Sequence, residues 1–562
     1  MSAVDESAGE DATSSDASLA RSSIVMAAGT LVSRILGLAR NALTAAVIGF
    51  GIIAADAWNA ANTLPNLFHL LLAGGVLNAV IVPQITKAMR HEDGGVTYVN
   101  RLLTLAMTVM AAVTVILVLA APWLVRLFTS SSWDGPSRGL ATAFAVICMP
   151  QVFFYGLYTL LGQVLAAKSR FAAFMWAPAL ANLVAIAGLA WFPLTGQTLK
   201  APVSQWTPTM IAVLAGSATI SIMLQALVLI PSLMKIGFRY RPVWGLRGSG
   251  LGSASRMAMW AFGAVVVGQA GYIVTSNVLT GSTQEAAVDQ VQVAGLSGYS
   301  QAFLLFMLLH SLITVSLVTA LFTRLSHAAH DRDTAAVTAD LRRGMRMPAV
   351  ILIPGTAASI LLAPLVLQTT LIGNDRSSTD TVVGVLVGMM IGLVPYGWLY
   401  LIQRAFYAYE DGRTPLILQV VVTTIATGFN LYAATRPPEQ VATWVGIGQS
   451  VSNLAAATLG FYLLRRKLGP LGLRSVLGQN LKLIIAAGFA TAIGWFLLRA
   501  LVGWLGSGWS ASAVIALIVG FVILLLSMVG AAKLNVREVD DVIDRFAGRV
   551  LKRRRPRHAR RS

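Results

Sequence analysis

The chain has 562 residues, of which 56% are hydrophobic and 12% charged, and its mean hydropathy is +0.71. Soluble domains carry about a quarter charged residues, so this composition excludes a string of globular domains and predicts an all-α polytopic membrane protein. The net charge is +19, and the single cysteine, Cys148, excludes an intramolecular disulfide and argues against a cysteine-based metal site.

Residues 1–21 are expected to form a disordered acidic tail on the cytoplasmic side. They are rich in Ser and Ala, and acidic residues precede the first basic one, Arg21. The tail lacks the basic region of a cleaved signal peptide, so we expect the first apolar helix to be retained.

Apolar runs of about 20 residues or more then predict 14 transmembrane helices. We place them at residues 22–50, 55–88, 102–128, 139–166, 172–196, 207–234, 257–281, 292–323, 347–372, 381–403, 415–434, 440–464, 483–503 and 510–532. The expected organisation is an N-lobe of six helices (22–235), a C-lobe of six (236–466), a C-terminal helix pair (467–533) and a basic cytoplasmic tail (534–562).

An even number of helices places both termini on one side of the membrane. Most of the 42 Lys and Arg residues fall in the segments that a cytoplasmic N-terminus puts inside, which supports that orientation. The outer loops hold only Arg126, Arg138, Lys200, Arg376, Arg436 and Arg499. The tail "KRRRPRHARRS" is expected to rest on anionic lipid headgroups. No aromatic-interleaved nucleic-acid module accompanies it, so we expect no nucleic-acid partner.

Helix 1 contains two arginines, Arg34 and Arg40, in "LVSRILGLAR". A charge at this depth costs roughly 2.5–3.5 kcal/mol even on lenient insertion scales, so we expect both side chains to face a polar cavity, although Arg34 is near enough to the cytoplasm to snorkel. Their spacing corresponds to about 240° of helix rotation, which puts them on different faces. Asp56 follows as a residue of the cavity mouth or as the N-cap of helix 2.

Helix 2 is predicted to be a poor straight rod. Pro65 removes a helical hydrogen bond and Gly74-Gly75 allows bending, so these three residues are the expected hinge. Asn66 and His69 add polar groups to the same helix. Each could line the cavity, and His69 could equally be a packing residue held by a hydrogen bond, as could the other intramembrane histidine, His310 in helix 8.

Two stretches resemble each other at a fixed offset. "FYGLYTLLGQVLAAKSRFAAF" closes helix 4, and "PYGWLYLIQRAFYAYEDGRTP" closes helix 10, with Tyr155-Gly156 aligned to Tyr396-Gly397 at a separation of 241 residues. Six helices separate the copies, so both cross the membrane in the same direction. Parallel repeats of this kind build transporters whose substrate site lies between two lobes. Two ordinary helix ends would be the alternative explanation.

The intramembrane cations indicate the charge of the substrate. Arginine binds phosphate bidentately and never deprotonates, so arginines with a single carboxylate nearby suit an anionic, phosphorylated substrate. A cation exporter would need buried Asp or Glu instead. No nucleophile, metal-ligand cluster or phosphate loop is visible, so we expect neither an enzyme nor a cofactor or metal site.

The stretch "SRILGLARNALTAAVIGFGIIAADAW…ANTLPNLFHLLLAGGVLNAVIVPQI" resembles the opening signature of the MurJ/MviN lipid II flippases, within the multidrug/oligosaccharidyl-lipid/polysaccharide exporter superfamily. The segments "LLGQVLAAKSRFAA…APALANL" and "RAFYAYEDGRTP" look like its helix 4–5 and helix 10–11 signatures. The resemblance covers roughly residues 22–535. It implies export of the undecaprenyl-pyrophosphate-linked peptidoglycan precursor from the inner to the outer leaflet of the bacterial plasma membrane, for cell-wall biosynthesis and cell shape.

The resemblance also assigns residues. The family's helix-1 arginines fall on Arg34 and Arg40, its acid before helix 2 falls on Asp56, and Ser33 and Asn66 match family positions. The chain departs from the family at His69, where an arginine is common, and it has no arginine in helix 8. The family's sodium-site carboxylates also have no counterpart, so sodium coupling is not expected.

The Gly-Gly-Val-Leu variant of helix 2 is similar to actinobacterial members, some of which carry a cytoplasmic kinase-like domain. With about 30 residues after the last helix, we expect no such domain here. Rival interpretations are a flippase for another polyprenyl-linked glycan, a drug exporter, a polyprenyl-phosphate-sugar transferase, and a non-transporting scaffold that recruits cell-wall synthesis proteins. A monomer is expected.

Overall fold

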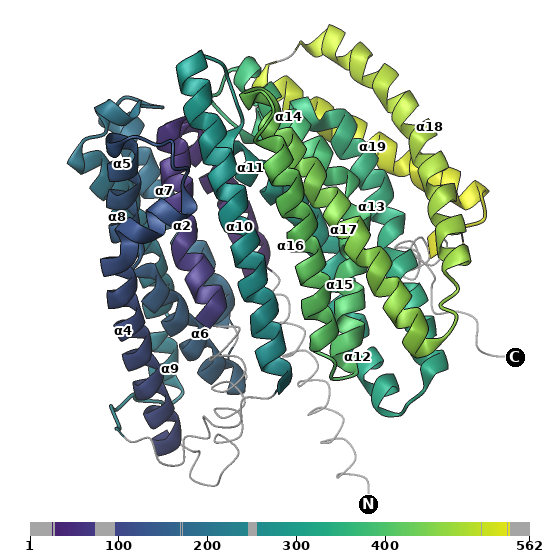
Figure 1. Ribbon diagram of the computed structural model, residues 1–562, viewed down its shortest axis with the longest axis horizontal. Coiled ribbons are helices and arrows are strands. Elements are labelled where there is room, and N and C mark those ends of the chain that lie inside the picture. Colours follow the sequence, from purple (N-terminus) through teal and green to yellow (C-terminus); the bar gives the residue numbers. More distant parts are fainter. Residues whose placement is uncertain are drawn as a thin grey trace, which may run out of the picture. The chain divides into compact units, whose positions relative to one another are not determined.

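The computed structural model describes residues 25, 28–72, 96–168, 170, 172–244, 256–506, 508–536 and 538–539. All regular elements within these ranges are helices, which confirms the all-α prediction (Figure 1). The chain divides into two compact units. Unit 1 comprises Met1–Gln290 with Gly295–Ser297 and Thr370–Asn374, and unit 2 comprises Val291–Ala294, Gly298–Thr369 and Asp375–Ser562.

Unit 1 contains the helices of the N-terminal part of the chain. In order, these are a first helix over Ala28–Ile48, α2 (Ile53–Leu72), α4 (Val96–Phe128), α5 (Gly135–Cys148), α6 (Gln151–Ala167), α7 (Ala172–Leu194), the short η2 (Val203–Gln205), α8 (Pro208–Leu227), α9 (Ile230–Lys235) and α10 (Arg256–Asp289).

The remaining helices belong to unit 2, apart from the first turn of α11 and the last residue of α13, Thr370, which are part of unit 1. They are α11 (Gly295–Leu309), the π-helix η4 (His310–Val315), α12 (Ser316–His330), α13 (Thr334–Thr370), α14 (Arg376–Ile391), α15 (Leu393–Ala408), α16 (Arg413–Ala433), α17 (Pro438–Leu468), α18 (Leu473–Leu505) and α19 (Trp509–Lys533).

The described residues include 11 helical stretches that are long and apolar enough to cross a membrane, and α14 with α15 forms a twelfth as a pair bent by 45°. The two other expected spans correspond to α2, whose predicted continuation to residue 88 lies outside the described residues, and to α17. The latter is 31 residues long, but its buried face includes Ser450, Ser452 and Asn453, which lower its hydropathy.

Small residues bring α2 and α5 together in unit 1. Ala57 and Ala61 in α2, and Ala141 and Ala145 in α5, are spaced four residues apart and fully buried. In a membrane, lipid tails compete with apolar side chains, so helices associate through close packing of such small residues more than through hydrophobicity. This pairing fixes the start of α2, which carries candidate site residues.

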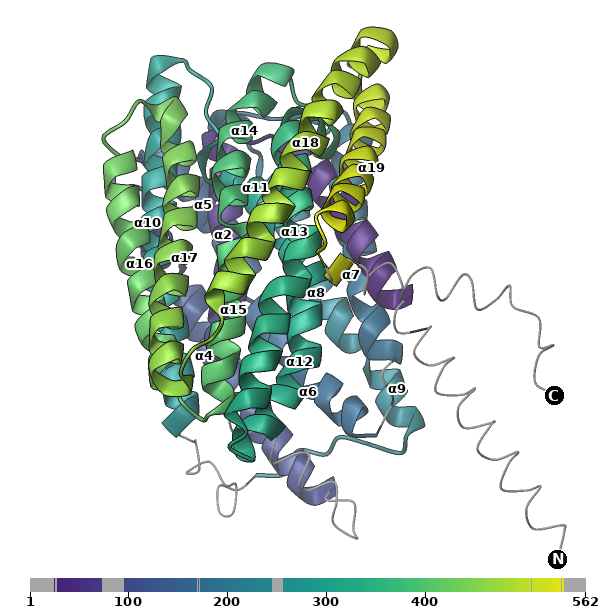
Figure 2. The ribbon, with the colours of Figure 1, turned by 90° about the vertical axis from the view of Figure 1, so that its right-hand side faces the viewer.

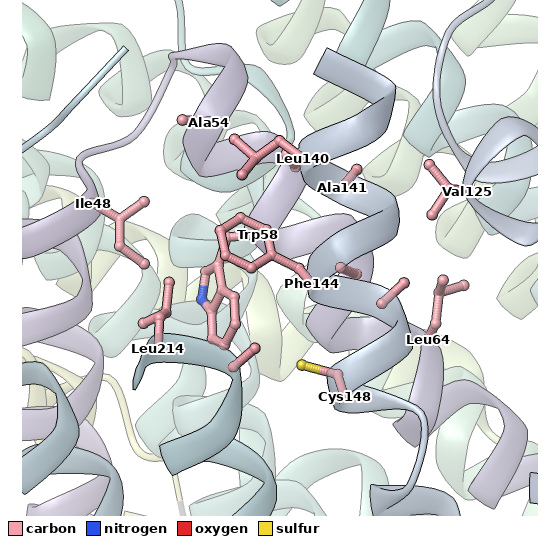
Figure 3. Packing of buried hydrophobic residues seen from close by; sticks show 14 of the residues in the cluster. Ile48, Ala54, Trp58, Leu64, Val125, Leu140, Ala141, Phe144, Cys148 and Leu214 are labelled. Carbon is pink, nitrogen blue, oxygen red and sulfur yellow. The ribbon is translucent and has the colours of Figure 1, made fainter. Parts of the chain in front are cut away.

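An aromatic cluster completes the same core (Figure 3). Phe144 packs edge-to-face on Trp58, with ring centroids 5.4 Å apart, and on Trp206, at 5.2 Å. Such pairs contribute about 0.5–1.5 kcal/mol beyond their burial. At the N-terminus of α5, Asp134 caps the helix by accepting a 2.8 Å hydrogen bond from the Ser137 N–H. Hydrogen bonding to Ser137 lowers the pKa of the exposed Asp134 carboxyl.

Unit 2 contains a close helix contact of a different kind, between α14 and α17. A Cβ on Gly388 would lie 3.0 Å from the Ile447 backbone nitrogen, and one on Gly392 would lie 2.4 Å from the Ser450 hydroxyl. The C-terminal helices α18 and α19 lie side by side in both views (Figure 1 and Figure 2). They pack through a stripe of buried apolar residues that includes Ala490, Val519 and Ile523.

Candidate functional site

Arg40 is half-buried, in the first helix of unit 1. Its guanidinium lies close enough to the Tyr155 hydroxyl, in α6, for an electrostatic interaction between the two side chains. The backbone around it is regular α-helix, and the Arg40 carbonyl also accepts a 2.8 Å hydrogen bond from the Thr44 hydroxyl. Among the described residues no carboxylate forms an ion pair with Arg40, so its positive charge is available to bind an anion.

His69 joins the same cluster from α2. Its imidazole stacks on the Tyr155 ring, with centroids 5.3 Å apart and planes inclined by 29°. The ring is half-buried, and its Nδ1 is buried without a hydrogen-bond partner among the residues the structure describes. Tyr155 therefore lies between an arginine and a histidine that belong to different helices.

Arg34 and Ser33 occupy the preceding turns of the first helix. Arg34 is exposed, whereas Ser33 is half-buried and its backbone carbonyl accepts a 2.9 Å hydrogen bond from the Asn182 side chain in α7. The different exposure of Arg34 and Arg40 agrees with their rotation around the helix. Only Arg40 lies in the Tyr155 cluster.

Asp56 is fully buried, with 0% exposure, in the first turn of α2. It is not the N-cap of its own helix, which begins at Ile53. Its carboxylate instead accepts hydrogen bonds from the backbone N–H groups of Leu296 (3.0 Å) and Ser297 (2.7 Å), and from the Thr283 hydroxyl (2.6 Å). Asp56 thus caps the N-terminus of α11, which has no side-chain cap of its own.

The backbone at Gly295 makes this cap possible. Gly295 has φ +59°, and a Cβ there would lie 2.5 Å from the Thr283 hydroxyl and 2.7 Å from the Asp56 carboxylate. The Ser297 hydroxyl in turn accepts a 3.0 Å hydrogen bond from the Gly51 N–H. The start of α2 and the first turn of α11 are therefore connected by several hydrogen bonds within unit 1. Asp56 is occupied by structural donors rather than left open to a substrate.

The remaining predicted residues lie elsewhere along helix 2. Pro65 is buried inside α2, which continues through it as a helix, and Asn66 is exposed. Gly74 and Gly75 lie outside the described residues. The hinge therefore stays a prediction.

The internal repeat reappears in three dimensions. In unit 2, His310 packs on Tyr396 with ring centroids 4.5 Å apart, as His69 packs on Tyr155 in unit 1. The two histidines are separated by the same 241 residues as the two tyrosines. His310 lies in the π-helix, is 1% exposed, and also contacts Tyr400 at 5.5 Å. Two copies of one local arrangement support the parallel-repeat interpretation of the Tyr-Gly motif.

Sequence reasoning did not assign Tyr155, Thr283 or Ser297 to the site. The Tyr-Gly echo marked Tyr155 as part of a repeat, and its offset also joins His69 to His310, so comparing the two copies residue by residue would have found the pair. Thr283 and Ser297 carry no such signal. Within the described residues, no group of three or more His, Cys, Asp or Glu side chains could hold a metal ion.

We expect the Tyr155 ring to matter for stability and its hydroxyl for the contact with Arg40. Replacing Tyr155 by Phe keeps the stack on His69 and should leave the melting temperature of the purified protein almost unchanged. Replacing it by Ala leaves a cavity and should cost about 3 kcal/mol. Tyr462→Ala is the control, because that ring is exposed. Equal melting temperatures for Y155A and Y462A would contradict the packing role.

The sequence of the chain is similar to those of known proteins. The family model described as "Lipid II flippase MurJ" matches residues 44–531. A probable lipid II flippase MurJ from Haemophilus influenzae is 25% identical over 461 residues, covering 78% of this chain and 84% of the relative. The lipid II flippase MurJ of Burkholderia cenocepacia is 28% identical over 416 residues, covering 72% and 77%.

Solved structures agree at the level of the fold. A lipid II flippase MurJ in an inward closed conformation aligns with a TM-score of 0.67 at 18% identity, covering 91% of this chain and 99% of that one. An inward-facing multidrug resistance MATE transporter of the MOP superfamily aligns with a TM-score of 0.63 at 16% identity, covering 80% and 98%. Because the family model spans most of the sequence, this multi-pass membrane protein belongs to the lipid II flippase MurJ family.

Proposed function

We propose that this protein is a lipid II flippase of the bacterial plasma membrane. It moves the lipid-linked peptidoglycan precursor from the inner to the outer leaflet for cell-wall synthesis. The observation that carries the proposal is the family match over residues 44–531, together with an uncompensated arginine, Arg40, held beside Tyr155 inside unit 1. The charge of that arginine matches the pyrophosphate of such a precursor.

The residues of the cluster take different roles in this mechanism. Arg40 binds the pyrophosphate, and the Tyr155 hydroxyl lies within electrostatic range of its guanidinium. His69 stands where the family commonly has an arginine, and its Nδ1, which has no partner among the described residues, offers one further polar contact. Arg34, which is exposed, attracts the anion before it reaches Arg40, while Ser33 and Asn66 border the path. Transport then exposes this site alternately to the two sides of the membrane.

The alternative of a drug exporter has a fold similarity in its favour, through the MATE transporters. Exporters of cations need a membrane-buried carboxylate free to bind them. Among the described residues the buried acids are Asp56 and Asp340. Asp56 is capping α11, and Asp340 forms an ion pair with Arg324 at 2.9 Å. The phosphorylated substrate is therefore the better match.

The topology and partners follow from the same proposal. Both termini are cytoplasmic, because this orientation puts most Lys and Arg inside. The basic C-terminal tail rests on anionic lipid headgroups, and the protein acts as a monomer without a cofactor. Recruitment of cell-wall synthesis proteins is compatible with this arrangement.

Depletion of the protein in its host should reduce the lipid II that can be labelled at the outer surface of intact cells, while total lipid II rises or stays constant. Transport is what connects the two pools, so the ratio of surface to total lipid II is the measurement. Re-expression of the wild-type chain should restore the ratio. An unchanged ratio after depletion, in cells shown to lack a second flippase, would refute the function. A fall in both pools would indicate a role in synthesis instead.

A further inference from the structure

A polar pocket of about 350 Å³ lies in unit 2, where α13, α18 and the segment after α19 meet. Its lining includes Arg346 from α13, Ser475, Gln479 and Lys482 from α18, and Glu538. None of these residues belongs to the Tyr155 cluster or is used in transport as proposed above. The pocket is therefore a separate feature that needs its own explanation.

The described residues that line the pocket carry a net positive charge. Arg346 uses one nitrogen, Nη1, for a 3.0 Å ion pair with Glu538, and its Nε is buried without a partner in the described part of the chain. Lys482 donates one hydrogen bond, 2.8 Å long, to the Leu534 carbonyl and has two further donors. One acid against two cations leaves an excess of one positive charge and several free donors, which suits a phosphate.

The N-terminus of α18 adds to this potential. The helix begins at Leu473 after Gly472, without a side-chain cap, and Ser475 of its first turn lines the pocket. The positive end of a helix dipole thus borders the pocket. The pocket also contains an acceptor, because Gln479 Oε1 is buried and has no partner among the described residues. A ligand that satisfies all these groups must offer both anionic oxygens and a hydrogen-bond donor. An uncharged hydroxyl suits this donor position better than an ammonium group, because the two cations nearby would repel a second positive charge.

An exposed apolar surface continues from the pocket along α18. Lys482, Ile485 and Phe489 are three and four residues apart and so share one face of the helix. Ile485 is 44% exposed and Phe489 72% exposed. By the predicted topology, Lys482 and Arg346 lie at the cytoplasmic ends of their spans. A polar head at Lys482 would therefore lie at headgroup depth, with its chains along Ile485 and Phe489.

We propose that this pocket binds the headgroup of an anionic glycerophospholipid that carries free hydroxyls, in the cytoplasmic leaflet. The phosphodiester contacts Lys482 and the Nε of Arg346, and a headgroup hydroxyl donates to Gln479. The lipid joins α13, α18 and the end of α19, so it stabilises the docking of the C-terminal helix pair. This role is independent of the substrate.

The test uses the full chain purified in detergent, with phosphatidylglycerol as the probe and phosphatidylcholine as the uncharged comparison. Retained lipid is counted by native mass spectrometry, and melting temperature is measured over a lipid titration. Phosphatidylglycerol should bind and raise the melting temperature, whereas phosphatidylcholine should not. Lys482→Gln should weaken phosphatidylglycerol binding by about tenfold or more, the effect of losing one hydrogen bond to a charged group. Gln479→Leu should weaken it less.

Lys533→Gln is the matched control, because Lys533 is exposed, lies at the end of α19 and does not line the pocket. Equal loss of binding in K482Q and K533Q would show general surface attraction and overturn the site. Stabilisation by inorganic phosphate alone, abolished by K482Q, without any effect of the lipid, would replace the lipid by a free anion. Failure of the flippase test would leave these measurements unaffected.

Discussion

Replacing Asp56 by Ala should lower the free energy of unfolding by about 3–5 kcal/mol, because three donors lose their acceptor at once and hydrogen bonds to a charged group contribute about 1.5–3 kcal/mol each, without full additivity. The donors are the Thr283 hydroxyl and the N–H groups of Leu296 and Ser297. Thermal unfolding of the purified protein measures the loss. The loss of stability in Asp56→Asn should be smaller than in D56A, since the amide oxygen can still accept hydrogen bonds.

Two further variants separate the hydrogen bonds from the charge. Thr283→Val removes one donor to the charged carboxylate and should cost about 1.5–3 kcal/mol. Gly295→Ala leaves all charges in place but puts a methyl group 2.7 Å from the carboxylate at a positive φ, so it should destabilise as D56N does. Asp375→Asn is the control, because Asp375 is exposed and makes no side-chain cap. If D56A had the same melting temperature as the D375N control, the cap would be shown not to stabilise the protein.

Replacing Arg40 by Ala should reduce lipid II export by at least about tenfold, since a charge-assisted hydrogen bond to phosphate is roughly twice as strong as a neutral one and arginine makes two. Arg40→Lys should recover part of the activity, because lysine keeps the charge and loses the bidentate geometry. Export is measured as the ratio of surface to total lipid II in depleted cells that express each variant.

Three comparisons make this result specific. Arg34→Ala should lose less than R40A, because Arg34 is exposed and lies apart from Tyr155. Arg499→Gln should export normally, since that arginine stacks on Trp495 in unit 2. His69→Arg should keep or raise export if the position serves the anion. Normal export by the R34A/R40A double variant, at wild-type protein levels, would reject the arginine mechanism while sparing the function.

The helices could be predicted from the sequence because each span is an apolar run bounded by polar residues. The breaks within them could not. Helix 4 was expected at 139–166 as one element, and it divides into α5 and α6 where Pro150 lacks a backbone donor. Helix 10 bends by 45° at Gly392, where the Ser450 hydroxyl donates to the carbonyls of Gly388 and Met389. Ser450 belongs to another helix, so no local pattern reveals this bend.

In the candidate site, too, some residues could be predicted from the sequence and others could not. Charge in an apolar helix marked Arg40 from the sequence alone. The role of Asp56 could not be predicted, because its partners lie between 227 and 241 residues further along the chain. Local reasoning placed Asp56 at the cavity mouth or at the N-cap of its own helix. A carboxylate can cap any helix that the fold brings to it, and sequence spacing does not report which.

The π-helix at His310–Val315 gives this helix one place where its length can change. A π-turn accommodates one residue more than an α-turn, so loss of a single residue there would close it into an α-turn without changing which way the downstream helix faces. Loss of a residue from the α-helical turn that follows would instead rotate everything downstream by about 100°. Val318, Leu321 and Leu325 of α12 would then turn away from the core of unit 2, in which they are now buried. We therefore expect natural relatives with a similar helix to differ in length by one residue at these six positions, but not in the turn after them.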